Sequence, residues 1–235
     1  MATEALVIDW AQMPTYNTIM SVAAGAGLLL VVGLGRAVLH RPKEVAVEGW
    51  ALAFGVLGVL LTTTGLHMTL TWPLAAGGFP FDNVIFGEPA LGFGVLLLAA
   101  AFWLWKRGRA ALDAPEPLAV LRRTAGPMSV LILGLGLACF AIAAAGVGYE
   151  LFAAPPEEPI SGEFADYPMI EAVFISGLYV LVGVGAVLFP VALAKPRRWV
   201  HRVIGVVWGL AGLAFLLFGA LNYFTHIGLI VNTMG

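Results

Sequence analysis

The chain has 235 residues, of which 60 % are hydrophobic and only 11 % are charged. Since about a quarter of the residues of a soluble domain are charged, this composition excludes an ordinary soluble protein and indicates a surface that contacts lipid. The net charge is −2, and the basic clusters are short, so a nucleic-acid partner is not expected.

Six apolar runs are each long enough to cross a bilayer, which takes about 20 residues of helix. In chain order, the sequence predicts membrane-spanning helices at 17–39, 49–72, 88–105, 127–149, 169–194 and 203–230. We therefore expect an all-α fold, a polytopic transmembrane helix bundle of about six spans that forms a single domain over residues 1–235.

All twelve Lys and Arg residues fall on one side of a bundle with six spans. They are Arg36, Arg41 and Lys43 after the first span, Lys106, Arg107, Arg109, Arg122 and Arg123 between the third and fourth, and Lys195, Arg197, Arg198 and Arg202 around the last connection. Because positive residues are retained in the cytoplasm, we expect a multi-pass protein of the plasma membrane with cytoplasmic basic loops and both termini outside.

The two longer connections on the opposite side differ in character. Residues 73–87 are rich in Gly, Pro and Phe, and we expect them to lie along the outer interface or to dip into the bundle. Within them, Asp82 and Asn83 are typical of turns. Residues 150–168 are acidic and rich in proline, which predicts a solvated segment.

Four residues that can ligate metals are expected at one depth near the outer face. At about 1.5 Å per residue, His67 lies roughly 28 Å above Glu48, and His226 lies roughly 36 Å above Arg202. Glu88 and Glu171 begin the third and fifth spans at a similar height. Polar groups within lipid are costly, so such a layer indicates a functional pocket.

This layer admits several interpretations. Two histidines facing one another can ligate haem iron, and two histidines with one or two carboxylates can hold a transition-metal ion. The same histidines can instead be hydrogen-bonded struts between helices or carry protons. Each glutamate can simply stabilise the N-terminus of its helix. No catalytic motif is present, so catalytic residues are not assigned.

Three short motifs resemble those of a known family. They are Met13-Pro14-Thr15-Tyr16-Asn17-Thr18, Gly65-Leu66-His67-Met68-Thr69-Leu70-Thr71-Trp72-Pro73 and Phe86-Gly87-Glu88-Pro89-Ala90. On these residues, and over most of its length, the chain resembles a family of prokaryotic membrane proteins catalogued as domain of unknown function 981. The resemblance implies a polytopic membrane protein and carries no established activity, so it assigns no role to any residue.

Three functional hypotheses follow from the sequence. The first is a redox or metal-centred protein in which His67 and His226 bind haem b or a transition metal, with Glu88 or Glu171 as a further ligand or proton acceptor. The second is a small proton-coupled transporter that uses the same residues as a relay. The third is a non-catalytic subunit of a larger membrane complex. Beyond the lipid bilayer, the expected partners are a second copy of the chain or the other subunits of such a complex.

Overall fold

The computed structural model describes residues 8–74, 79–195 and 197–234. Within these ranges the protein is helical, and none of the described residues lies in a strand. The six long helices are α1 (Asn17–His40), α2 (Val47–Leu70), α3 (Glu88–Trp103), α6 (Ser129–Gly148), α7 (Pro168–Ala194) and α8 (Arg198–Thr233). Two short helices, α4 (Arg109–Leu112) and α5 (Pro117–Ala125), connect α3 to α6.

The expected all-α bundle with six apolar spans is confirmed. The largest differences from the expected bounds concern the third and sixth spans. The third is extended by π-helical turns at Asn83–Gly87 and Leu104–Gly108, so that the helical segment runs over Asn83–Leu112. The sixth begins at Arg198, because a basic, polar turn of helix that hydropathy does not mark continues the helix beyond the apolar run.

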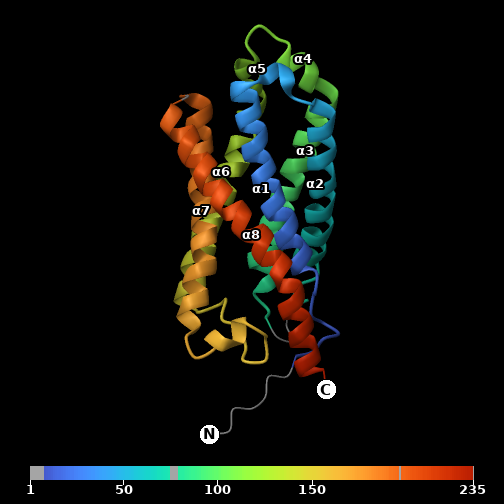
Figure 1. Ribbon diagram of the computed structural model, residues 1–235, viewed down its shortest axis with the longest axis vertical. Coiled ribbons are helices and arrows are strands. Elements are labelled where there is room, and N and C mark those ends of the chain that lie inside the picture. Colours follow the sequence, from blue (N-terminus) through green and yellow to red (C-terminus); the bar gives the residue numbers. More distant parts are fainter. Residues whose placement is uncertain (1–7, 75–78, 196, 235) are drawn as a thin grey trace.

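The six long helices form an incomplete ring (Figure 1). Following the ring, α3 packs against α2, α2 against α1, α1 against α8, α8 against α7, and α7 against α6. The long helix α8 crosses α1 obliquely and thereby joins the two halves of the molecule. The end helices of the ring, α3 and α6, contact each other at few positions.

Glycine allows the closest helix contacts in this ring. A Cβ atom at Gly25 in α1 would lie 2.5 Å from the carbonyl oxygen of Gly212 in α8. Likewise, a Cβ atom at Gly65 in α2 would lie 2.5 Å from the backbone nitrogen of Leu91 in α3. Only residues without a side chain let the backbones approach so closely, as is common in membrane helix pairs.

The two ends of the bundle differ in charge. One end, at the top of Figure 1, carries the connections 41–46 and 104–128 and the turn from α7 to α8; we call it the basic end. The other end carries the C-terminal end of α8 and the connecting residues 71–74, 79–82 and 149–167; we call it the acidic end. The predicted gathering of the Lys and Arg residues at one end is therefore present in the fold.

The two connections at the acidic end pack more closely than the sequence suggests. Asn83 is buried, and its Nδ2 atom donates a hydrogen bond to the carbonyl oxygen of Met68, so the chain here dips against α2. In the connection 149–167, Phe152 is buried and stacks on Tyr179 of α7. The expectation of a solvated segment at 150–168 is correct only in part: Glu150, Glu163 and Asp166 are exposed, while Phe152 anchors the segment to the bundle.

Candidate functional site

The predicted site residue His67 lies at the acidic end of α2 with its side chain exposed. Its Nδ1 atom is 2.6 Å from the hydroxyl oxygen of Tyr16, which directly precedes α1. The two rings also meet edge to face, with centroids 5.7 Å apart. This histidine therefore ties the end of α2 to the beginning of α1, as expected for a hydrogen-bonded strut.

His226 lies near the acidic end of α8, with a different partner. Its Nε2 atom is 3.8 Å from a carboxylate oxygen of Glu158, in the connection between α6 and α7. Glu158 is largely buried, which raises the pKa of its carboxyl group, and the Thr225 hydroxyl partly offsets this rise. The sequence analysis missed Glu158, since an acidic residue in a Pro-rich loop gives no signal of burial.

The two predicted glutamates lie in the first turns of their helices. Glu171 accepts a hydrogen bond of 2.6 Å from the backbone N–H of Ala154, and Glu158 is close enough to act on it electrostatically. Glu88 is exposed at the start of α3. Glu171 thus contributes to the same polar contacts as His226, through Glu158, while Glu88 stands apart from them.

The structure does not pair the two histidines with each other. His67 bonds to Tyr16 and His226 contacts Glu158, and α1 packs between the helices that carry them. Over the described ranges, no group of three or more His, Cys, Asp or Glu side chains is arranged to hold a metal ion. The described contacts of His67 and His226 tie helices and connections together at the acidic end.

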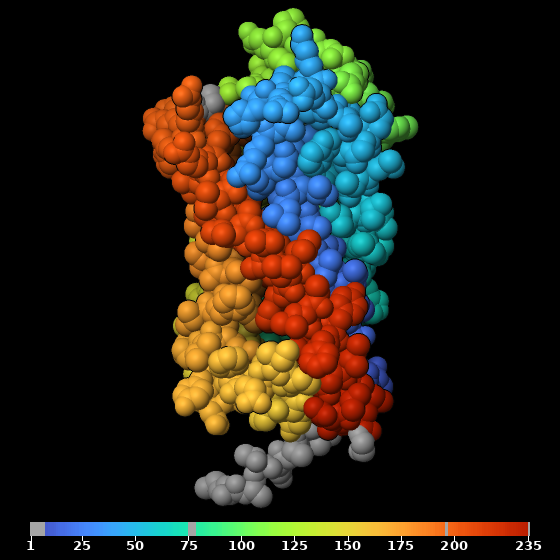
Figure 2. Space-filling view, in the orientation of Figure 1, coloured from blue at the N-terminus to red at the C-terminus, as the bar shows by residue number. Residues whose placement is uncertain are grey.

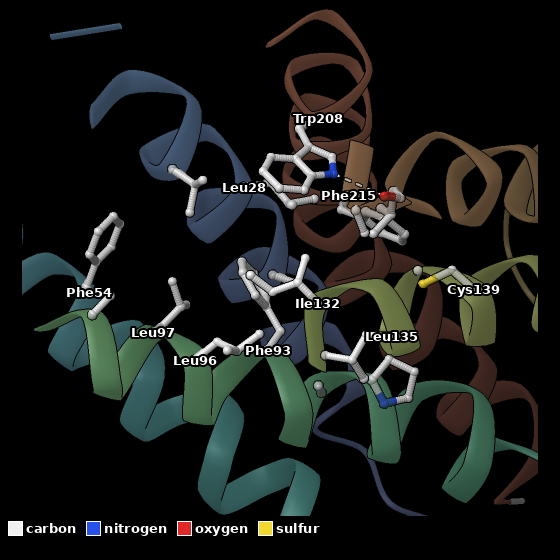
Figure 3. Close-up of a pocket in the computed structure, with 18 of the residues that line it drawn as sticks. Leu28, Phe54, Phe93, Leu96, Leu97, Ile132, Leu135, Cys139, Trp208 and Phe215 are labelled. Carbon is white, nitrogen blue, oxygen red and sulfur yellow. Dashed lines mark hydrogen bonds between the residues drawn. The ribbon is translucent and has the colours of Figure 1, made fainter. Parts of the chain in front are cut away.

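A cavity of about 770 Å³ lies inside the ring of helices (Figure 3). Side chains from four helices point into it: Leu28 of α1, Phe93 of α3, Leu135 of α6 and Trp208 of α8 are examples. Pockets that bind small molecules in proteins have volumes of roughly 300–1,000 Å³. This cavity thus has the size of a binding site.

The lining is apolar, with no charged side chain among the described residues that form it. Several of its polar side chains donate hydrogen bonds to backbone carbonyl oxygens. Tyr179 donates to Ile85 at 2.6 Å, Trp208 to Val182 at 3.0 Å, and Ser21 to Phe215 at 2.8 Å. Because these donors are satisfied, the cavity offers hydrocarbon surface to whatever occupies it.

The cavity runs along most of the membrane thickness. Its lining includes both Asn17 and Leu34 of α1, which are separated by about 25 Å along a helix. Spread over that length, the volume corresponds to a mean cross-section of about 30 Å². At the acidic end of the cavity, the buried Oδ1 atom of Asn17 has no hydrogen-bond partner among the described residues. The space is long, narrow and almost wholly apolar.

The weak contact between α3 and α6 forms one wall of the cavity. The two helices approach each other where Leu135 of α6 covers Gly92 of α3. A Cβ atom added at Gly92 would lie 2.8 Å from the Cδ2 atom of Leu135. Leu135 also lines the cavity, so its side chain lies both at this contact between α3 and α6 and at the wall of the interior space.

The sequence analysis missed the cavity altogether. Its lining residues are Leu, Phe, Ala and other apolar types that also face lipid or neighbouring helices elsewhere in the same spans. No polar stripe marks the face of a helix that lines an apolar space, so composition and periodicity carry no signal for it.

The fold and the cavity define the class of this chain: a polytopic, all-helical membrane protein whose helices contact the bilayer. Within that class, it belongs to the family described as "Protein of unknown function (DUF981)", which matches residues 13–228. No curated protein and no solved structure matches the chain.

Proposed function

We propose that this protein binds a long apolar molecule, taken from the bilayer, in the cavity between its helices. The observation that carries the proposal is the charge-free space of about 770 Å³ that runs along α1. An empty apolar space of this size would forfeit the contacts that stabilise a packed interior. A hydrocarbon tail would restore them, and its length suits a space of about 25 Å.

The route of entry supports the same ligand class. A molecule dissolved in the bilayer would reach the cavity between α3 and α6, past Leu135, without crossing water. A polar substrate would instead need hydrogen-bond partners along the lining, where the Tyr179, Trp208 and Ser21 donors are already used.

The test is to measure what the detergent-purified protein retains. Lipid is extracted and quantified per protein by mass spectrometry for wild type and for Ala100→Phe, which places a ring in the cavity lining. The control is Ala144→Phe on α6, at an exposed position outside that lining. We expect Ala100→Phe to lose most of the retained lipid and Ala144→Phe to keep it. Equal retention by all three proteins would overturn the proposal.

The haem or metal hypothesis is a separate proposal for the acidic end. Its supporting observation is the contact of His226 with Glu158, which in turn is close to Glu171. The visible spectrum and metal content of the purified wild type, beside His67→Ala/His226→Ala, test it. A Soret band or stoichiometric metal that disappears in the double variant would support it, and a colourless, metal-free wild type would remove it.

The cavity also bears on the transporter hypothesis that the sequence suggested. A carrier is the second candidate function, because the cavity extends towards both ends of the bundle and could guide an apolar molecule between leaflets. A proton-coupled version would need a charged relay, and the described lining supplies no charged group.

We also propose that the basic end faces the cytoplasm, because juxtamembrane Lys and Arg are retained there.

A further inference from the structure

We propose that the ligand is an anionic lipid whose phosphate-bearing headgroup binds Arg107 in a recess at the basic end while its tail occupies the cavity. This inference rests on the proposed function, because it assigns a chemical class to the occupant of the same cavity. It adds a second site, which neither the hydropathy nor the family match indicates.

The recess adjoins the cavity. It has a volume of about 230 Å³ and lies where α3 continues into α4, facing α5. Its lining consists of Trp103, Arg107, Ala110, Ala111, Val120 and Thr124. Trp103 and Thr124 line the large cavity as well. A molecule whose tail occupies the cavity would therefore place its head in the recess.

Arg107 is the charged group in that lining, and it is available to a ligand. Its neighbours are engaged: the Lys106 ammonium lies 5.6 Å from the centre of the Phe102 ring, and Arg109 donates to the carbonyl oxygen of Val45. Arg107, by contrast, forms no ion pair within residues 8–74, 79–195 and 197–234. A guanidinium group with free N–H donors matches the oxygens of a phosphate.

The surroundings favour an anion over a zwitterion. The connection 104–128 carries five basic and two acidic residues, so its net charge is positive. The indole N–H of Trp103, whose ring lies at the junction of the two spaces, donates to no described residue and can accompany Arg107. The Thr124 hydroxyl is less available, because it donates to the carbonyl oxygen of Val120.

The depth of the recess also fits a lipid. Trp103 and Arg107 lie at the basic end of the third span, where headgroups of the adjacent leaflet are found and where aromatic and basic side chains are typical. A lipid from that leaflet can thus keep its head at its normal depth while its tail passes between the helices.

The experiment titrates the full, delipidated chain in detergent and reads lipid binding by native mass spectrometry. The probes are dioleoylphosphatidylglycerol, dioleoylphosphatidylcholine and inorganic phosphate alone. We expect the wild type to bind the anionic lipid about tenfold more tightly than the zwitterionic one, the size expected for one charge-assisted hydrogen bond. Arg107→Gln should weaken the binding of both lipids, because both headgroups carry a phosphate, and should remove most of the preference, because the choline cation already weakens the attraction of phosphatidylcholine to Arg107 in the wild type.

Arg123→Gln is the matched control, since Arg123 is an exposed arginine of α5 outside the recess. It should keep the preference for the anionic lipid. Loss of the preference in both variants would show general surface attraction and overturn the inference, as would its survival in Arg107→Gln. A third outcome would also overturn the inference: inorganic phosphate binds to the wild type and to Ala100→Phe equally well, and neither protein binds lipid. The recess would then be a site for free anions.

The two proposals can fail separately. If Ala100→Phe loses both lipids while Arg107→Gln changes neither, the cavity binds apolar tails and the headgroup assignment is wrong. If instead Ala100→Phe binds both lipids as tightly as the wild type does, the lipid does not bind in the cavity and the proposed function is wrong.

Discussion

The Nε2 atom of His226 lies 3.8 Å from a carboxylate oxygen of Glu158, which joins α8 to the connection between α6 and α7. A second tie lies nearby, where Asn232 donates a 2.7 Å hydrogen bond to the backbone oxygen of Glu157. Figure 2 shows this connection against the C-terminal end of α8. The His226 and Glu158 side chains are only 25 % and 11 % exposed, so water screens their interaction incompletely.

His226→Ala should loosen this connection. Losing one partly buried polar contact of about 1 kcal/mol corresponds to roughly fivefold faster amide hydrogen exchange over residues 150–166. Hydrogen exchange read by mass spectrometry measures the effect in detergent. The matched control is His201→Ala at the basic end, which should leave that segment unchanged. Unaltered exchange in His226→Ala would show that the His226–Glu158 contact does not hold the connection in place.

Asp82 should make the stability of the protein depend on pH. It precedes the third span, is 5 % exposed, and burial raises its pKa from 3.8 to about 7. The folded state therefore binds more protons than the unfolded state between these values, and the free energy of unfolding falls as pH rises from about 4 to about 7. Above pH 7 the free energy of unfolding is lower than at pH 4 by the whole effect, which is of the order of 4 kcal/mol.

The side chain in Asp82→Asn is uncharged at every pH, so the variant should not lose stability as the pH rises. Thermal midpoints in detergent should be similar for wild type and variant near pH 4, and the variant should be clearly more stable near pH 8. Glu88→Gln, which removes an exposed carboxylate of the same segment, corrects for the change in net charge. A constant difference between Asp82→Asn and wild type across this range would contradict a buried carboxyl group that titrates near neutral pH.

Gly25→Ala should separate α1 from α8. The added methyl carbon would lie 2.4 Å from the backbone nitrogen of Leu216, an atom that cannot move aside without shifting the helix. Overpacking of this kind costs about 1–3 kcal/mol. In contrast, a Cβ atom at Gly134 in α6 meets no atom within 4 Å, so Gly134→Ala should be neutral or slightly stabilising. Thermal unfolding followed by circular dichroism compares the two, and equal midpoints would rule out the close approach.

The orientation of the bundle can be tested with single cysteines. The native Cys139 is buried and should not react with a membrane-impermeant maleimide in intact cells. Glu163→Cys, exposed at the acidic end, should be labelled from outside. Lys43→Cys, exposed at the basic end, should be labelled only after the membrane is permeabilised. The reverse pattern would place the basic end outside and contradict the proposed topology.

The spans could be predicted because transfer of a helix into lipid depends on its own composition. Each of the six expected ranges contains the apolar part of a helix in the structure. The observed bounds differ from the expected ones where polar turns continue the helix, as at Arg198, and where the backbone geometry changes, as in the π-helical turn Asn83–Gly87. Hydropathy reports only the length of the apolar run, so it detects neither a polar turn that continues a helix nor a change to π-helical geometry.

The candidate site was predicted only in part, and for a specific reason. Counting residues along a helix places His67 and His226 near one end, where the structure has them. Their partners, Tyr16 and Glu158, come from the segment before α1 and from a loop, which no helical periodicity connects to them. The depth of a residue follows from its own helix, whereas its neighbours depend on the other helices.

The sequence by itself determined the number of spans, their alternation and the separation of basic from acidic connections, because these depend on local hydropathy and charge. Only the tertiary structure decided the order of the helices around the ring, the loose seam between α3 and α6, and the cavity that Leu135 and Trp208 help to line. In lipid, every face of an apolar helix is equally well solvated, so hydrophobicity cannot select neighbours. Close packing at residues such as Gly25 and Gly65 selects them, and that is a property of helix pairs.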